Sequence, residues 1–397
     1  MRRLEILEGG MFTTVQDLGR VQYQRFGVAV SGAMDPFALR AANRLVGNPD
    51  EAAALEATMT GPELRFAHNA VVAVTGADLS PRLDGRPLRM WASVPARAGA
   101  LLSFAGLRSG MRAYIAIDGG IDLPLVLGSR STSTRAGLGG FEGRAVRAGD
   151  VLPIGDPVCD GPRWGSAPTN IRDDSDDLSR PLSSGVGADP RVGPSSTPHR
   201  GIRRGVPRQA IPIYTHDHVV RVVLGPQEDA FTDAALETLR TAVYTMTAQS
   251  DRIGCRFQGP PLVHRVSADI VSDGTTMGSV QVSGDGMPIV LMADRGPTGG
   301  YTKIAAVISV DLSRLAQAVP GDRVRFQVVA LDEAHRLLRT ERGVLDAIEA
   351  SGANGAADVP VDVYDEDTGA PLAAPAWCDL ADAIESTRAK ERHGDRR

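Results

Sequence analysis

The stretch Ala70-Val71-Val72-Ala73-Val74 is a short apolar run that ends at a glycine-containing turn, and Tyr114-Ile115-Ala116-Ile117 is a run of the same kind. Residues 323–330 place apolar side chains at alternate positions, which is the period of a half-buried strand. Many short strands between turns are typical of barrels and sandwiches. Gly61-Pro62-Glu63-Leu64 is echoed by Gly259-Pro260-Pro261-Leu262. The sequence therefore predicts a mainly β fold with a few helices, built from two related β-rich domains.

Helices are expected at a few places between and after these strands. Asp35-Pro36 is a favourable N-cap followed by proline, and Gly47-Asn48 suits the end of the helix that begins there. A second helix is expected over residues 232–241. Apolar residues at helical spacing between 334 and 348 predict an amphipathic helix, and residues 381–390 are a further candidate.

The predicted domain organisation has four parts. Residues 156–210 are rich in Pro, Gly, Ser, Asp and Arg, and such a composition cannot bury enough apolar surface to offset the entropy of ordering the chain. We therefore expect a disordered insert there, between a first β half at 1–155 and a second at 211–330. Residues 331–397 are expected to form a C-terminal helical extension.

Composition restricts the class of protein. With 42% hydrophobic and 23% charged residues, the chain has the make-up of an ordinary globular protein. Its net charge of −5 argues against a nucleic-acid or anionic-membrane partner, and no run approaches the roughly 18 apolar residues of a membrane span. The three cysteines lie far apart, so neither a disulfide framework nor a zinc ribbon is predicted. We expect a cytoplasmic protein without a metal site.

Two polar segments of the first half are candidates for ligand binding. Residues 13–20, which include Asp17, mix polar groups with glycine. The loop Leu127-Gly128-Ser129-Arg130-Ser131-Thr132 offers backbone donors, hydroxyl groups and a guanidinium that suit an anion. Asp17, Arg130 and Ser131 are therefore predicted to bind substrate. The alternatives are plain turn chemistry at 13–20 and a hydrated loop at 127–132, just as Asp35 is also explained by helix capping.

A third segment, in the second half, carries the strongest candidates. Only two of the 43 basic residues are lysines, Lys303 and Lys390. Because arginine supplies positive charge elsewhere, an internal lysine suggests a need for a compact ammonium group with a tunable pKa; the alternative is a surface lysine retained by chance. Tyr301 and Lys303 would share a face of an extended strand. The predicted catalytic residues are Lys303, Tyr301 and Asp294, and the predicted substrate-binding residues are Gln281, Gly299 and Gly300.

Several mechanisms find no support in the sequence. Neither lysine lies in a phosphate-binding loop motif, and no G-x-S-x-G nucleophile elbow occurs. Neither lysine is flanked by methionines, so we expect no covalently attached biotin. His216 and His218 could face one side of a strand as metal ligands, but no third His or Cys lies nearby.

A series of motifs in a fixed order resembles the biotin-dependent-carboxyltransferase-like family. The resemblance covers about residues 4–330 without the insert. Its motifs are Thr14-Val15-Gln16-Asp17-Leu18-Gly19-Arg20, Ser31-Gly32-Ala33-Met34-Asp35, Ala42-Asn43-Arg44-Leu45-Val46-Gly47-Asn48, Leu127-Gly128-Ser129-Arg130-Ser131-Thr132, Gln281-Val282, Asp294-Arg295, Thr298-Gly299-Gly300-Tyr301 and Arg323-Val324-Arg325-Phe326. It implies two cyclophilin-like β-barrel domains and a partner of similar fold.

The resemblance also implies chemistry on an amide or ureide. Family members include a component of the ATP-dependent 5-oxoprolinase, which opens a lactam to glutamate with subunits A and B, and the carboxyltransferase portion of urea carboxylase. Donors for a carbonyl oxygen (Lys303, Tyr301, Arg130) and partners for an N–H group (Gln281, Asp294) suit such substrates. A chain without its own biotin favours the 5-oxoprolinase function, with ATP used by the complex. A carboxyltransferase fed by a separate biotin carrier and a non-catalytic regulatory subunit remain alternatives.

Overall fold

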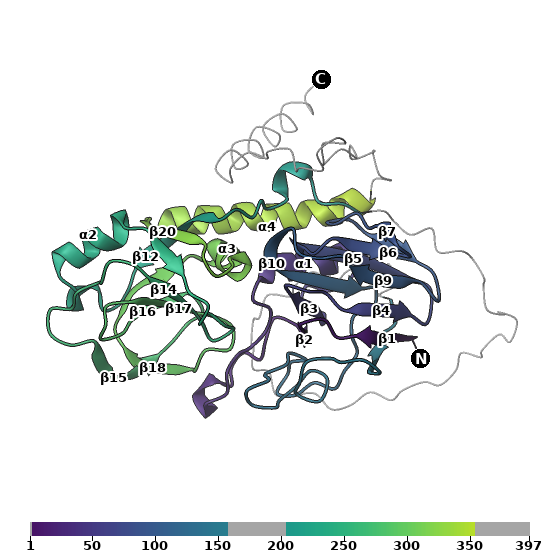
Figure 1. Cartoon of the computed structure of the whole chain (residues 1–397), viewed down its shortest axis with the longest axis horizontal. Helices are drawn as coiled ribbons and strands as arrows, with labels where there is room; N and C mark the ends of the chain where they lie inside the picture. The colour runs from purple at the N-terminus through teal and green to yellow at the C-terminus, as the bar shows by residue number, and fades with distance from the viewer. Residues whose placement is uncertain (1, 158–203, 354–397) are drawn as a thin grey trace, which may run out of the picture.

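The computed structural model describes residues 2–157 and 204–353 (Figure 1). Strands dominate these residues, and four α-helices accompany them, which confirms the mainly β fold with a few helices. Within the described residues, no helix is both long enough and apolar enough to cross a membrane. The candidate helix at 381–390 lies outside the described residues.

Two antiparallel sheets form the first half. One has the order β11 (Val151–Ile154), β1 (Arg2–Glu8), β4 (Glu63–Phe66), β9 (Leu101–Phe104), β6 (Pro81–Leu83), β7 (Arg86–Pro87). The other has the order β2 (Phe12–Gln16), β3 (Ala54–Thr58), β10 (Ser109–Ile117), β5 (Ala70–Asp78), β8 (Val94–Ala96). Apolar side chains from both sheets share one buried core. This half differs from the expected closed barrel because its strands hydrogen-bond within two separate sheets.

The second half is a closed barrel. Its strands follow the order β12 (Asp217–Leu224), β19 (Lys303–Val307), β16 (Ser279–Val282), β17 (Pro288–Leu291), β14 (Gly254–Gln258), β13 (Tyr244–Met246), β20 (Arg323–Val328). A two-stranded ribbon of β15 (Asp269–Gly274) and β18 (Thr298–Tyr301) stands beside it. The ribbon and the barrel strands β16 and β19 carry most of the candidate residues of this half.

The helix predictions are confirmed for three segments. The first is α1 (Pro36–Val46): the Asp35 carboxylate accepts the Ala38 N–H at 3.0 Å, and Gly47 ends the helix in the left-handed conformation. The second is α2 (Asp233–Thr241), which Thr232 caps. The third is α4 (Leu331–Ala353), while α3 (Leu312–Gln317) was not expected.

Helix α4 runs along both halves (Figure 1). Its Val344, Leu345 and Ile348 are buried in the apolar cluster that surrounds α1 in the first half. Leu337, nearer its start, packs with Ile308 from the second half. The C-terminal extension therefore begins as a brace between the halves, because one amphipathic face contacts both.

The insert ends earlier than predicted. Residues 158–203 lie outside the described residues, but 204–210 pack against the first half instead of forming part of a loose segment. Gly205 forms a bridge with Ala92, and Val206 has only 2% of its surface exposed. The Arg204 N–H also donates to Ser93 Oγ at 2.7 Å. Placing the boundary at 210 was wrong because the few apolar side chains after residue 203 suffice to anchor the chain.

Replacing residues 158–203 with a short Gly/Ser linker is expected to leave the melting temperature nearly unchanged, because long surface connections add little to loop-closure cost. A matched deletion that also removes residues 204–210 exposes the apolar surface on which Val206 packs. It is expected to lower the free energy of unfolding by about 1.5–3 kcal/mol, which lowers the melting temperature by several degrees. Differential scanning fluorimetry on the full chain and both variants measures this. A large loss from the shorter deletion would show that residues 158–203 contribute to stability.

Candidate functional site

A glutamine, two glycines and a lysine meet next to the barrel wall. Strands β16 and β19 pair antiparallel with Gln281 opposite Lys303. Gly299 lies directly against the Gln281 side chain, because a Cβ atom at this position would collide with Gln281 Nε2. The same Nε2 faces the Tyr301 carbonyl oxygen at 3.4 Å. The fold thus brings Gln281, Gly299, Gly300, Tyr301 and Lys303 together.

Lys303 is held by a carboxylate that the sequence does not single out. The lysine side chain is buried, with 4% of the residue exposed, and its Nζ donates to Asp273 Oδ2 at 2.9 Å. The hydrogen bond from Lys303 lowers the pKa of Asp273. Asp273 lies on the exposed strand β15, whose polar composition gives no sign of a site. The pair fixes the ammonium group in one position.

The expectation that Tyr301 and Lys303 share one face is wrong. Strand β18 ends at Tyr301 and β19 begins at Lys303, so the two residues do not belong to one continuous strand. Tyr301 is 39% exposed, whereas Lys303 is almost fully buried. Thr302 between them is also buried, and its hydroxyl group bonds His264 Nε2 at 2.9 Å. The tyrosine therefore stands at the rim of the cluster.

Asp294, the third predicted catalytic residue, belongs to an ion-pair network between the two halves. Arg252 Nε donates to Asp294 Oδ2 at 2.8 Å, and Arg252 Nη2 donates to the Gly32 carbonyl oxygen at 2.6 Å. Arg252 Nη1 donates to Glu56 Oε1 of β3. Burial alone would lower the pKa of Arg252, but the charges of Glu56 and Asp294 outweigh it and raise the pKa. One arginine thus ties both halves together.

The network continues into the first half through a buried tyrosine. Tyr114 Oη donates to Glu56 Oε2 at 2.7 Å and accepts the Asp35 N–H at 2.8 Å. The Asp35 carboxylate, besides capping α1, accepts Ser313 Oγ at 2.7 Å and Gln317 Nε2 at 2.9 Å from the second half. Burial raises the pKa of Asp35. Capping of α1 is confirmed, and the same carboxylate also joins the halves.

The candidate residues of the first half form hydrogen bonds mainly with one another and with nearby backbone groups. Asp17 accepts the hydroxyl groups of Ser129 at 2.7 Å and Ser131 at 2.5 Å, and the N–H groups of Gly19 at 2.7 Å and Arg130 at 2.5 Å. The Arg130 side chain turns away, to the Leu123 carbonyl oxygen at 2.6 Å and Asp122 at 2.7 Å. Asp17 and Ser131 shape the loop, and Arg130 does not present its guanidinium to a site.

The His216 and His218 side chains do not form a metal site. Both rings contact the Asp322 carboxylate, at 2.7 and 3.0 Å. Among residues 2–157 and 204–353, no group of three or more His, Cys, Asp or Glu side chains could hold a metal ion.

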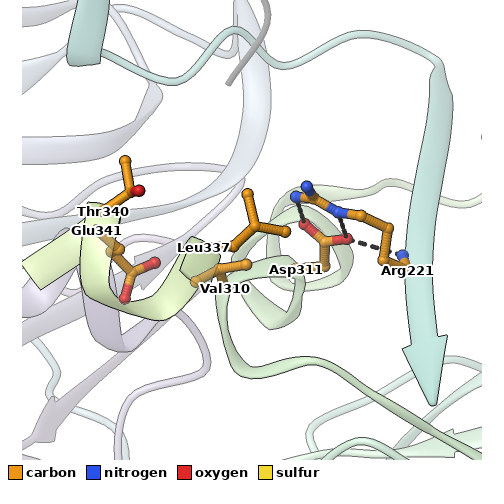
Figure 2. A pocket seen from close by; sticks show the side chains of 6 residues that line it. All are labelled: Arg221, Val310, Asp311, Leu337, Thr340 and Glu341. Carbon is orange, nitrogen blue, oxygen red and sulfur yellow. Dashed lines mark hydrogen bonds and ion pairs between the residues drawn. The ribbon is translucent and has the colours of Figure 1, made fainter. Parts of the chain in front are cut away.

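Figure 2 shows a cavity beneath α4, lined by the Arg221–Asp311 ion pair and by Glu341. None of the predicted site residues lines it.

The chain is thus mainly β, its two halves are joined by ion pairs through Arg252, and its second half is a closed barrel. Residues 26–328 match the family model described as "Carboxyltransferase domain, subdomain A and B". The chain belongs to this family. It is similar to the C subunit of 5-oxoprolinase from Haemophilus influenzae, with 34% identity over 345 residues that cover 87% of this chain and 97% of the relative.

Further relatives agree with this placement. The corresponding 5-oxoprolinase C subunit of Escherichia coli is 34% identical over 83% of this chain and 93% of its own length. Among solved structures, the K. lactis urea amidolyase matches 87% of this chain with 29% identity and a TM-score of 0.72. The matched part is 20% of the amidolyase chain. Of these three proteins, the two 5-oxoprolinase relatives therefore match this chain over nearly their whole length, and the amidolyase does not.

Proposed function

We propose that this chain is the C subunit of an ATP-dependent 5-oxoprolinase, acting in the cytoplasm with subunits A and B. The observation that carries the proposal is the match to a 5-oxoprolinase C subunit over 97% of that relative's length. In the proposed reaction, ATP hydrolysis drives the addition of water across the lactam C–N bond of 5-oxoproline, which yields L-glutamate. No biotin is attached to this chain in the proposal.

The cluster on the second half supports chemistry on an amide. Gln281 carries both an amide donor and an acceptor, so it can recognise another amide. Gly299 leaves its backbone open to close approach. In our proposal the Lys303 ammonium, positioned by Asp273, stabilises negative charge that develops on the lactam oxygen. Such preorganised donors account for much of the rate enhancement in acyl chemistry.

The remaining candidates have assigned roles in this proposal. Tyr301, half-exposed at the rim, is a second donor toward the substrate, and Gly300 keeps the adjoining backbone accessible. Asp294 lies at the junction between the halves, where its carboxylate accepts from Arg252, and in the proposal a remaining lone pair of this carboxylate accepts the lactam N–H. Asp17 and Ser131 support this arrangement indirectly, since they fix the loop at residues 129–131.

Carboxyl transfer from carboxybiotin to a urea-type acceptor is the second candidate, because the urea amidolyase fold matches with a TM-score of 0.72. Both candidates use an amide or ureide substrate, so the cluster suits either one. They differ in what must be added: 5-oxoproline, ATP and two partner subunits in the first, and a biotinylated carrier in the second.

The chain alone is expected to be nearly inactive, and 5-oxoproline-dependent ADP release is expected only after assembly with subunits A and B. One reason is the exposed ribbon next to Lys303, which leaves room for a partner to complete the site. The other is the name of the relatives, which makes each of them one component of a larger enzyme. Purified chains, mixed singly and together, provide the test by coupled ADP assay. Full activity of the isolated chain would contradict the proposal.

A further inference from the structure

One arginine at the junction of the halves is buried and has acceptors for only part of its donors. Arg20 follows β2, has 1% of its surface exposed, and donates from Nη2 to the Ser131 carbonyl oxygen. Its Nε and Nη1 are buried and have no hydrogen-bond partner among residues 2–157 and 204–353. Buried guanidinium donors without acceptors are rare, since leaving them unpaired is costly. Arg20 Nε and Nη1 are therefore available to an acceptor that the described residues do not supply.

Neither neighbouring carboxylate accepts a hydrogen bond from Arg20 in the described part of the chain. The charges of Asp17 and Asp294 both act on Arg20. Asp17, however, already accepts four hydrogen bonds from the loop and its own turn. Both oxygens of Asp294 face Arg252. Burial lowers the pKa of Arg20, although the negative charges of Asp17 and Asp294 act to raise it. The guanidinium is charged, and its free donors remain unmatched.

A second unpaired group, a hydroxyl, lies on the segment that pairs with the Arg20 backbone. The backbone N–H of Arg20 donates to the Val30 carbonyl oxygen at 2.8 Å, so Ser31 is on the adjacent segment. Ser31 is 4% exposed, its Oγ has no partner in the described part of the chain, and its φ of +56° is unusual for a residue with a side chain. Backbone strain at a buried, unpartnered hydroxyl group is typical of a functional position. Arg20 Nε and Nη1 and the Ser31 hydroxyl group are thus buried polar groups on neighbouring segments without a partner among the described residues.

We propose that Arg20, assisted by Ser31, binds the carboxylate of 5-oxoproline. The inference rests on the proposed function and specifies which substrate group is recognised between the halves. Guanidinium groups form strong, charge-assisted hydrogen bonds with carboxylates. The charges of Asp17 and Asp294 both reach Arg20, and in the proposed function Asp294 accepts the lactam N–H. A substrate with a lactam at one end and a carboxylate at the other fits these two features, whereas urea has no carboxylate.

The test compares 5-oxoproline with 2-pyrrolidinone, the same lactam without the carboxylate, in the complex with subunits A and B. The wild type is expected to show a KM about 10- to 100-fold lower for 5-oxoproline. Arg20→Gln is expected to raise this KM toward that of 2-pyrrolidinone and to leave 2-pyrrolidinone kinetics and the KM for ATP unchanged. Arg20→Lys is expected to restore only part of the preference, because it keeps the charge without the planar fork.

Arg112→Gln is the matched control. Arg112 is also buried and has an unpaired Nε among the described residues, but its Nη1 donates to the Ala316 carbonyl oxygen at 2.5 Å. Removing the Arg112 guanidinium is expected to lower the stability of the fold without changing the ratio of the KM values for 5-oxoproline and 2-pyrrolidinone. Equal losses for both lactams in Arg20→Gln would assign Arg20 a structural role. A raised KM for ATP alone would assign it to a phosphate, and either result overturns the proposal.

A binding measurement separates this inference from the proposed function. In the full chain without partners, sodium acetate is expected to raise the melting temperature relative to sodium chloride at equal ionic strength, and Arg20→Gln is expected to abolish the difference. If the complex fails to hydrolyse ATP with 5-oxoproline but acetate still stabilises through Arg20, the proposed function fails and the carboxylate site stands. No acetate effect in the folded wild type contradicts the site itself.

Discussion

Replacing Lys303 with methionine is expected to lower turnover of the assembled complex by about 10²–10³-fold, the usual cost of losing one donor to a developing oxyanion. Methionine is the informative change because Lys303 is 4% exposed, so alanine would also create a cavity. Turnover is measured as 5-oxoproline-dependent ADP release, after the melting temperature has shown that the variant folds. Normal turnover by Lys303→Met would remove this residue from the site.

Lys303→Arg separates charge from position. The Lys303 ammonium lies 2.9 Å from Asp273, and the lysine itself is buried, so we expect the larger, planar guanidinium to displace its neighbours. We expect it to fail nearly as badly as methionine. Asp273→Asn keeps the shape and removes the charge, so it is expected to retain more activity than either Lys303 variant. A fully active Lys303→Arg beside an inactive Lys303→Met would reduce Lys303 to a source of positive charge.

Arg252→Met is expected to destabilise the chain by about 3–5 kcal/mol, because it leaves buried carboxylates without a counter-charge. The Glu56 and Asp294 side chains, 1% and 9% exposed, contact the same guanidinium from opposite halves. The measurement is the free energy of unfolding from denaturant titration. Converting Glu56 to glutamine in the same chain is expected to recover part of the loss, since one stranded charge is then absent.

Arg323→Met is the matched control for this change. Arg323 also pairs with an aspartate, Asp217, at 2.6 Å, but both side chains are largely exposed, at 61% and 62%. Exposed pairs contribute about 0–1 kcal/mol, so the control is expected to be close to wild type. Equal losses for Arg252→Met and Arg323→Met would contradict the view that the Arg252 network holds the halves together.

Local signals predicted much of the fold correctly. The helix α1 followed from Asp35, a proline and Gly47, which act on neighbouring backbone groups at the two ends of one short segment. The anchoring of 204–210 and the bridging role of α4 could not be predicted, because both depend on surfaces supplied by distant parts of the chain. A composition rich in polar residues gave no reason to expect that Val206 is buried.

Part of the candidate site was predictable because it too depends on local features of the sequence. The scarcity of lysine singled out Lys303, and its position beside Gln281 and Gly299 follows from two paired strands. The pairing of Arg252 with Glu56 joins residues 196 positions apart, and nothing in either segment indicates the other. Arg20 belongs to the motif at residues 14–20, but only the completed fold reveals that its Nε and Nη1 lack an acceptor in the described part of the chain.

The proposed opening of the lactam is tested most directly with isotope-labelled 5-oxoproline. The labelled substrate and ATP are supplied to this chain together with subunits A and B, and labelled glutamate and ADP are followed over time. We predict glutamate and ADP in equal amounts with all three chains present, and a loss of both when this chain is left out or carries Lys303→Met. Undiminished glutamate formation without this chain, or carboxyl transfer from carboxybiotin to urea with no glutamate at all, would contradict the account.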